Sequence, residues 1–150
     1  MKERYAIVSA VYLLTRDEHN RVLMGKRQNS GYYDEWYGVP AGHVDGNESL
    51  KSAMIREAKE ELDIDIKAED LTLVHTLHRA KTGDYERLDF FFTCDTWQGE
   101  PRIAEPDKCT ELTWIDPTDE SVNIMHHVRR VIERVEHGQN YSDEDFELVG

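Results

Sequence analysis

The segment from Gly42 to Ile64 constrains the fold and the chemistry of this chain more than any other part of the sequence. It begins as a loop containing Gly42 and Gly46, and it becomes helical after Ser49, a residue type that commonly caps a helix N-terminus. Apolar residues then recur on one face of the predicted helix, at Leu50, Met54, Ala58 and Leu62. The segment therefore predicts a loop that leads into an amphipathic helix.

Three glutamates of this helix lie beside its apolar face. Glu57 and Glu61 are four residues apart and Glu60 follows Glu57 by three, so the three carboxylates are neighbours on the helix surface. Like charges at this spacing cost about 0.2–0.5 kcal/mol per pair, and partial burial raises that cost. Such a run usually forms a solvated helix face. A bound divalent cation would instead remove both penalties.

The complete spacing of the segment resembles the Nudix box, the sequence signature of the Nudix hydrolase family. The fixed positions of the box are matched by Gly42, Glu48, Arg56, Glu57, Glu60 and Glu61. The resemblance extends over essentially the whole chain, but only residues 36–64 carry a specific signature. It implies an α/β fold, the Nudix-type α/β/α sandwich with a mixed β-sheet.

One position departs from the family pattern, because Asp63 stands where the family has glycine. This position lies just past the helix, where a residue in the left-handed conformation commonly ends it. Asp and Asn adopt that conformation more readily than other non-glycine residues. We therefore expect Asp63 to have a positive φ and to leave the site intact.

The resemblance assigns roles to the residues of the box. It implies that Mg²⁺ or Mn²⁺ is held by the helix carboxylates, Glu57, Glu60 and Glu61. Glu48 would be an outer or water-mediated ligand, and the backbone around Gly42 would shape the loop beneath the ions. Hard cations of this kind prefer oxygen ligands and keep several waters.

Two further roles follow from the same resemblance. Arg56 is similar to the family arginine that orients a box glutamate through an ion pair, so it joins the glutamates in the catalytic set. Some family members bring an additional carboxylate from a later part of the chain. Candidates for that general base are Glu105, Asp107 and Glu111.

The reaction implied is hydrolysis of a pyrophosphate bond in a nucleoside diphosphate linked to another group. Markers of the ADP-ribose and coenzyme A subfamilies are absent, and the chain is compact. Both observations favour a (d)NTP, including noncanonical or oxidised forms, as the substrate that gives NMP and pyrophosphate. NDP-sugars, dinucleoside polyphosphates and a non-catalytic nucleotide-sensing module are the alternatives.

A loop over residues 28–37 is rich in aromatic side chains, which are Tyr32, Tyr33, Trp36 and Tyr37. These rings either cap the core or stack on a nucleobase, a contact worth about 1–3 kcal/mol per base. The second interpretation gives Tyr32 and Trp36 as substrate-binding residues. Arg27, which ends the preceding strand, is the candidate for a phosphate contact.

Hydrophobic patterning predicts strands over residues 5–15, 22–24, 71–78, 87–95 and 109–115. The first is apolar on both faces, which indicates a central buried strand, and the second is expected to form a hairpin with it. A helical repeat predicts a second helix over residues 124–135, ended by Gly138. Residues 1–138 are thus expected to form the Nudix hydrolase domain and residues 139–150 an acidic, extended or partly disordered C-terminal tail.

Charge and composition restrict the partners. Eighteen basic and 31 acidic residues give a formal net charge of −13, which disfavours a nucleic-acid polymer but not a small-molecule nucleotide substrate. Two cysteines, Cys94 and Cys109, have no metal-binding or redox spacing. No apolar run has membrane-spanning length and no signal-peptide pattern is present, so we expect no membrane association and a cytoplasmic monomer or homodimer.

Overall fold

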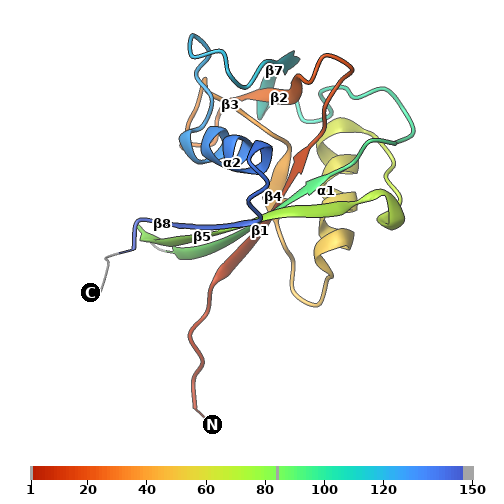
Figure 1. Ribbon diagram of the computed structural model, residues 1–150. Coiled ribbons are helices and arrows are strands. Elements are labelled where there is room, and N and C mark those ends of the chain that lie inside the picture. The colour runs from red at the N-terminus through yellow and green to blue at the C-terminus, as the bar shows by residue number, and fades with distance from the viewer. Residues whose placement is uncertain (1, 84, 147–150) are drawn as a thin grey trace.

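The computed structural model describes residues 2–83 and 85–146 (Figure 1). Its larger sheet has five strands in the order β4-β1-β6-β5-β8. The strands are β1 (Val8–Leu14), β4 (Ala41–His43), β5 (Thr72–Thr82), β6 (Tyr85–Thr93) and β8 (Tyr141–Glu144). The sheet is mixed, because β1 is antiparallel to β4 and parallel to β6, while β5 is antiparallel to β6 and parallel to β8.

The smaller sheet has three antiparallel strands in the order β3-β2-β7. These are β2 (Val22–Arg27), β3 (Tyr37–Gly38) and β7 (Cys109–Ile115). The predicted hairpin between β1 and β2 is wrong, since β1 and β2 are not paired in the described sheets. The chain after β1 meets β2 at an isolated bridge between Arg16 and Val22 and at a hydrogen bond from the Leu23 N–H to the Thr15 carbonyl. The physical reason is that β4 and β6 already occupy both edges of β1, so β2 pairs with β7 instead.

The helices α1 (Leu50–Leu62) and α2 (His126–Glu136) pack against opposite faces of the larger sheet (Figure 1). A short 3-10 helix, η1 (Ala68–Asp70), precedes β5. Side chains of β1 alternate between the two cores: Val11 and Leu13 face the α1 side, whereas Tyr12 and Leu14 face the α2 side. The predicted central, doubly buried strand and the α/β/α arrangement are thereby confirmed. Neither helix in the described residues is long and apolar enough to cross a membrane.

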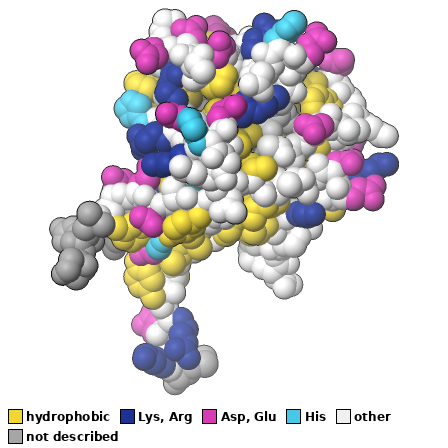
Figure 2. Space-filling view, viewed as in Figure 1, with side chains coloured by type: hydrophobic (Ala, Val, Ile, Leu, Met, Phe, Trp, Pro, Cys, Tyr) yellow, Lys and Arg dark blue, Asp and Glu magenta, His cyan; other side chains and the backbone are white. Residues whose placement is uncertain are grey.

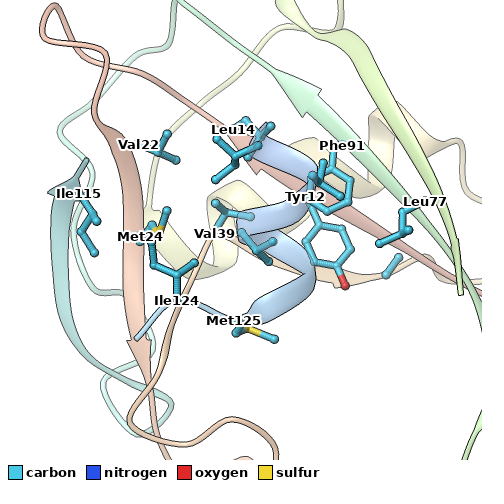
Figure 3. Packing of buried hydrophobic residues seen from close by; sticks show 14 residues of the cluster. Tyr12, Leu14, Val22, Met24, Val39, Leu77, Phe91, Ile115, Ile124 and Met125 are labelled. Atoms are coloured by element: carbon cyan, nitrogen blue, oxygen red, sulfur yellow. The ribbon is translucent and has the colours of Figure 1, made fainter. Parts of the chain in front are cut away.

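The core on the α2 side joins the two sheets (Figure 3). Met24, Val39 and Ile124 lie between the smaller sheet and the helix, and all are at least 93% buried. On the larger sheet, the rings of Tyr12 and Phe91 stack with their centroids 4.4 Å apart. This packing fixes the segment after β3, which carries the first residues of the Nudix-box-like loop.

Part of the predicted tail belongs to the larger sheet. Residues Tyr141–Glu144 form β8 alongside β5, while residues 147–150 lie outside the described residues. Two arginines of α2 hold this strand, with Arg130 and Arg134 lying 2.7 and 2.9 Å from the carboxylate of Glu144. Figure 2 shows apolar side chains gathered along the lower part of this view, over β5 and β8.

The ion pairs of Glu144 predict a pH-dependent contribution to stability. The Arg130 guanidinium, assisted by Arg134, lowers the pKa of Glu144 to about 2. Because this pKa lies below the unfolded value, the stabilisation is present above about pH 4.5 and is lost as the pH falls toward 2. We expect Glu144→Gln to lower the free energy of unfolding by about 1–2 kcal/mol at pH 7. This value is smaller than the pKa shift alone implies, because solvent screens the half-exposed Arg130.

Urea unfolding at pH 7 and pH 3 measures this effect. The difference between wild type and Glu144→Gln should shrink at the lower pH. The control is Glu133→Gln, at an exposed position of α2, since it changes the net charge equally without removing an ion pair. A difference that is the same at both pH values would contradict the prediction.

Candidate active site

The helix that carries the box glutamates begins and ends at well-defined caps. The hydroxyl of Ser49 accepts a hydrogen bond from the backbone N–H of Ser52 at 3.0 Å, which confirms the predicted N-cap. Asp63 ends the helix with φ 56° and ψ 39°, as expected for a left-handed helix stop. Its backbone N–H donates to the carbonyl of Lys59 at 3.1 Å.

The Asp63 side chain adds contacts that its backbone role does not require. Its carboxylate accepts a hydrogen bond from Arg102 Nε at 2.9 Å and lies 3.1 Å from Lys59 Nζ. We expect Asp63→Val to lower the free energy of unfolding by about 1–2 kcal/mol, because a β-branched residue is strained at positive φ. Asp63→Gly should be near neutral, because relief of the backbone offsets two exposed ion pairs worth about 0–1 kcal/mol each.

Chemical denaturation of the Asp63 variants separates these contributions. Asn at position 63 tolerates the left-handed backbone but forms neither ion pair. The free energy of unfolding of Asp63→Asn should therefore lie between those of the glycine and valine variants. A valine variant as stable as the glycine variant would show that the backbone conformation costs nothing.

The carboxylate of Glu57 lies directly against the backbone of Gly42. A Cβ at position 42 would be only 2.0 Å from Cδ of Glu57 and 2.2 and 2.3 Å from its two oxygens. Only glycine therefore fits beneath this carboxylate. The neighbouring Ala41 N–H donates to Glu61 Oε2 at 3.2 Å, so β4 positions both carboxylates.

Arg56 links the loop to the helix. Its Nη1 donates to Glu57 Oε1 at 2.8 Å, while Nε and Nη2 donate to the two carboxylate oxygens of Glu48 at 2.8 and 2.9 Å. Its Nη2 also donates to the carbonyl oxygen of His43 at 3.0 Å. The bidentate contact with Arg56, aided by the Asp45 N–H, lowers the pKa of Glu48 to about 2. Both oxygens of Glu48 are thus occupied by protein donors.

The box glutamates carry unfavourable charge. Burial raises the pKa of Glu57, and burial together with the charge of Glu57 raises the pKa of Glu61 to about 8. Within residues 2–83 and 85–146, no three His, Cys, Asp or Glu side chains surround a common point at metal-binding distance. The oxygen donors of Glu57, Glu60 and Glu61 nevertheless share one cavity, and three carboxylates beside the single cation of Arg56 suit a hard divalent cation.

The cavity has a volume of about 580 Å³. Its lining includes Arg27 and Tyr32, two of the predicted substrate-binding residues. Trp36 does not line it and instead packs edge-on against His126, with ring centroids 5.0 Å apart. The position of Trp36 therefore favours the core-capping interpretation for this ring, because α2 offers it an aromatic partner.

The three candidates for the general base have different positions. Glu105 lines the cavity, and its charge contributes to the raised pKa values of both Glu57 and Glu61. Glu111 accepts a hydrogen bond from the Tyr37 hydroxyl, and Asp107 is not part of the cavity lining. Glu105 is thus the one of the three that the structure brings together with the box glutamates.

Sequence reasoning missed several residues of the cavity. These are Tyr12 on β1, Arg79 on β5, Arg87 on β6, and Lys108, which directly precedes β7. For the two arginines, the available signal was a charged residue on a strand that also carries apolar residues. Asp89 and His127 are polar residues buried to at least 97%, and burial with the nearby Arg79 charge lowers the pKa of His127 to about 3.

The chain is similar in sequence to known proteins. The family model described as NUDIX domain matches residues 6–135. Nudix hydrolase 5 from Arabidopsis thaliana is 28% identical over 110 residues, which are 72% of this chain and 36% of that protein. The 8-oxo-dGTP diphosphatase of Proteus vulgaris is 29% identical over 84 residues, which are 56% of this chain and 72% of that protein.

A solved structure with a similar fold is that of a MutT NUDIX hydrolase from Burkholderia pseudomallei. It superposes with a TM-score of 0.77 at 25% sequence identity, and the match covers 87% of this chain and 99% of that chain. The chain thus spans nearly all of this structure but only about a third of the plant relative.

Proposed function

The chain belongs to the NUDIX domain family, and on this premise we propose that it hydrolyses a pyrophosphate bond in a nucleoside diphosphate linked to another group. The observation that carries the proposal is the cavity in which Glu57 and Glu61 lie together with the cations Lys26 and Arg27. Carboxylates supply ligands for a metal, and the neighbouring cations suit phosphate oxygens.

The metal in this proposal is Mg²⁺ or Mn²⁺, held by Glu57, Glu60 and Glu61. When bound, such an ion neutralises phosphate charge and lowers the pKa of a bound water. Glu48 is already held by Arg56, so its predicted contribution to the metal site would run through water. The role of Gly42 is to leave room for the Glu57 carboxylate.

The side chains of this protein prepare the site before substrate arrives. Arg56 holds Glu57 by a 2.8 Å hydrogen bond, and the Ala41 N–H holds Glu61, so both carboxylates have fixed positions. Arg27 and Lys26 attract the polyphosphate into an otherwise acidic molecule. Glu105 is our candidate for the base that accepts the proton of the attacking water.

For the substrate we propose a (d)NTP, including noncanonical or oxidised forms, cleaved to NMP and pyrophosphate. Support comes from the similarity to an 8-oxo-dGTP diphosphatase. NDP-sugars and dinucleoside polyphosphates are the alternative substrates. A sensing module without activity is disfavoured, because nothing in such a module requires repelling carboxylates to stay together.

A hydrolysis screen tests this function. (d)NTPs, NDP-sugars and dinucleoside polyphosphates are incubated with the full chain and Mg²⁺ or Mn²⁺, and the products are separated and identified. We expect metal-dependent release of NMP and pyrophosphate from a triphosphate. Binding of nucleotides without turnover of any of these substrates would favour the sensing module.

A further inference from the structure

Two arginines lie in the cavity on strands that are set apart from the box glutamates. Gly42 and Ala41, which position the carboxylates, belong to β4, whereas Arg87 and Arg79 belong to β6 and β5. In the order β4-β1-β6-β5, these are the second and third strands away from β4. Across the sheet, at about 4.8 Å per strand, Arg87 and Arg79 lie roughly 10 and 14 Å from β4. They are also offset along the strands, because Arg87 is level with Val8 of β1 whereas Gly42 is level with Val11.

Arg79 and Arg87 are direct partners in the antiparallel register of β5 and β6, so both side chains start from the same face of the sheet. Like charges placed directly opposite one another destabilise a sheet. Both guanidinium groups nevertheless line the same cavity. The arrangement therefore costs folding free energy that an anion between the two groups would recover.

One buried carboxylate compensates part of this charge. Asp89 is fully buried, and its Oδ2 accepts a hydrogen bond from Arg79 Nε at 2.7 Å, while its Oδ1 has no hydrogen-bond partner among the described residues. Asp89 thus fixes Arg79 through Nε. The two terminal nitrogens of Arg79 have only long contacts, 3.4 Å to the Tyr32 hydroxyl and 3.5 Å to the Tyr12 hydroxyl.

Arg87 lacks even this compensation. Among the side chains that the structure describes, no carboxylate lies within 4.0 Å of its guanidinium group. Glu144, which lies opposite Arg79 in the register of β5 and β8, is itself paired with Arg130 and Arg134 of α2. Among the described residues, four arginines therefore outnumber the two carboxylates of Asp89 and Glu144 at this end of the cavity. In a chain with a net charge of −13, a local excess of positive charge in a cavity indicates a specific anionic ligand.

We propose that Arg79 and Arg87, with the hydroxyl of Tyr32, bind a second anionic group of the substrate, located beyond the diphosphate that is cleaved. The inference rests on the proposed pyrophosphate hydrolysis. Among the candidate substrates of that function, it favours nucleoside diphosphates linked to an acidic group over the (d)NTPs. The preferred substrate carries a phosphate or carboxylate on the moiety attached to the diphosphate. Guanidinium groups match both anions in geometry and charge.

The test measures binding separately from hydrolysis. Affinities are determined by calorimetry in EDTA for two ligand pairs, NADH with NADPH and UDP-glucose with UDP-glucuronate. Members of the first pair differ by one phosphate and members of the second by one carboxylate, so the pairs distinguish the two anions. We expect wild type to bind the more highly charged member of at least one pair about tenfold more tightly.

Arg87→Gln should abolish this preference and change the affinity for the less charged member by less than twofold. Arg87→Lys, which keeps the charge but loses the planar fork, should retain part of the preference. Arg21→Gln is the matched control, because it removes one positive charge from an exposed turn. Thermal unfolding confirms that each variant is folded, and the loss of a like-charge pair should leave Arg87→Gln at least as stable as wild type.

Equal affinity for both members of both pairs, or no detectable binding of any, would overturn the inference. An equal loss of the charge preference in Arg21→Gln and Arg87→Gln would also overturn the inference. The proposed function is judged by hydrolysis with Mg²⁺. Charge-selective binding without hydrolysis would refute that function alone, and hydrolysis without charge selectivity would refute the inference alone.

Discussion

Replacing Glu57 and Glu61 together with Gln is expected to lower kcat by about 10²–10⁴-fold. Gln preserves the shape of each side chain and removes its charge, so the variant loses the ligands that would hold a cation against the polyphosphate. Stabilisation of transition-state charge by a metal is worth several kcal/mol, and each 1.36 kcal/mol is tenfold in rate. Initial rates at saturating substrate and Mg²⁺ measure this loss.

The fold of this double variant should survive. Removing the two carboxylates from the metal-free protein relieves their repulsion but also removes the Arg56–Glu57 ion pair, so the free energy of unfolding should change by no more than about 1 kcal/mol. Calorimetric titration with Mn²⁺ should show weakened metal binding. Glu69→Gln combined with Glu100→Gln, an exposed control that also removes two carboxylates, should leave both rate and metal binding unchanged. Near-normal turnover of the double variant would refute the metal assignment.

Gly42→Ala is expected to lower kcat by about 10²-fold, the effect typical of a reacting group misplaced by about 1 Å. A methyl group at this position would overlap the Glu57 carboxylate, with 2.0 Å to its carbon. Either the carboxylate leaves Arg56 or the β4 loop moves away from the helix. Both displacements take Glu57 from its place in the cavity, and steady-state kinetics measure the consequence.

Gly46→Ala is the matched control, because a Cβ at that position meets no atom within 4 Å. It should retain full activity. Combining Gly42→Ala with Glu57→Asp, which shortens the side chain by one carbon, should partly relieve the overlap without restoring full rate. A fully active Gly42→Ala variant would show that the position of Glu57 is not needed for turnover.

The parts of the structure that could be predicted are those specified by neighbouring residues. The cap at Ser49 and the left-handed stop at Asp63 follow from local conformational preference, and the structure confirms both. The strand over residues 109–115 has the predicted bounds, because its polar boundaries lie next to it in the chain. Local signals of this kind do not depend on what packs against the segment.

Features that depend on distant segments could not be predicted from the sequence. The apolar residues of β2 fit a hairpin with β1 equally well, and only the later placement of β6 removes the edge on which that hairpin depended. The orientation of the Trp36 ring depends on His126, ninety positions further along the chain. The sequence did not indicate that Arg79 and Arg87 line the cavity, since charged strand residues usually face solvent.

The strand β8 lies at the edge of the larger sheet, next to β5. Without β8, the eleven-residue β5 would end the sheet with a long row of unpaired backbone groups, and such an edge is a template for aggregation. The four-residue β8 pairs with Thr76–Arg79 and so covers part of this edge, and its Asp143 is exposed. A short strand and an exposed charge both discourage strand addition by another chain. We therefore expect the acidic segment to disfavour self-association at this edge, although it contributes no residue to the cavity that holds the glutamates.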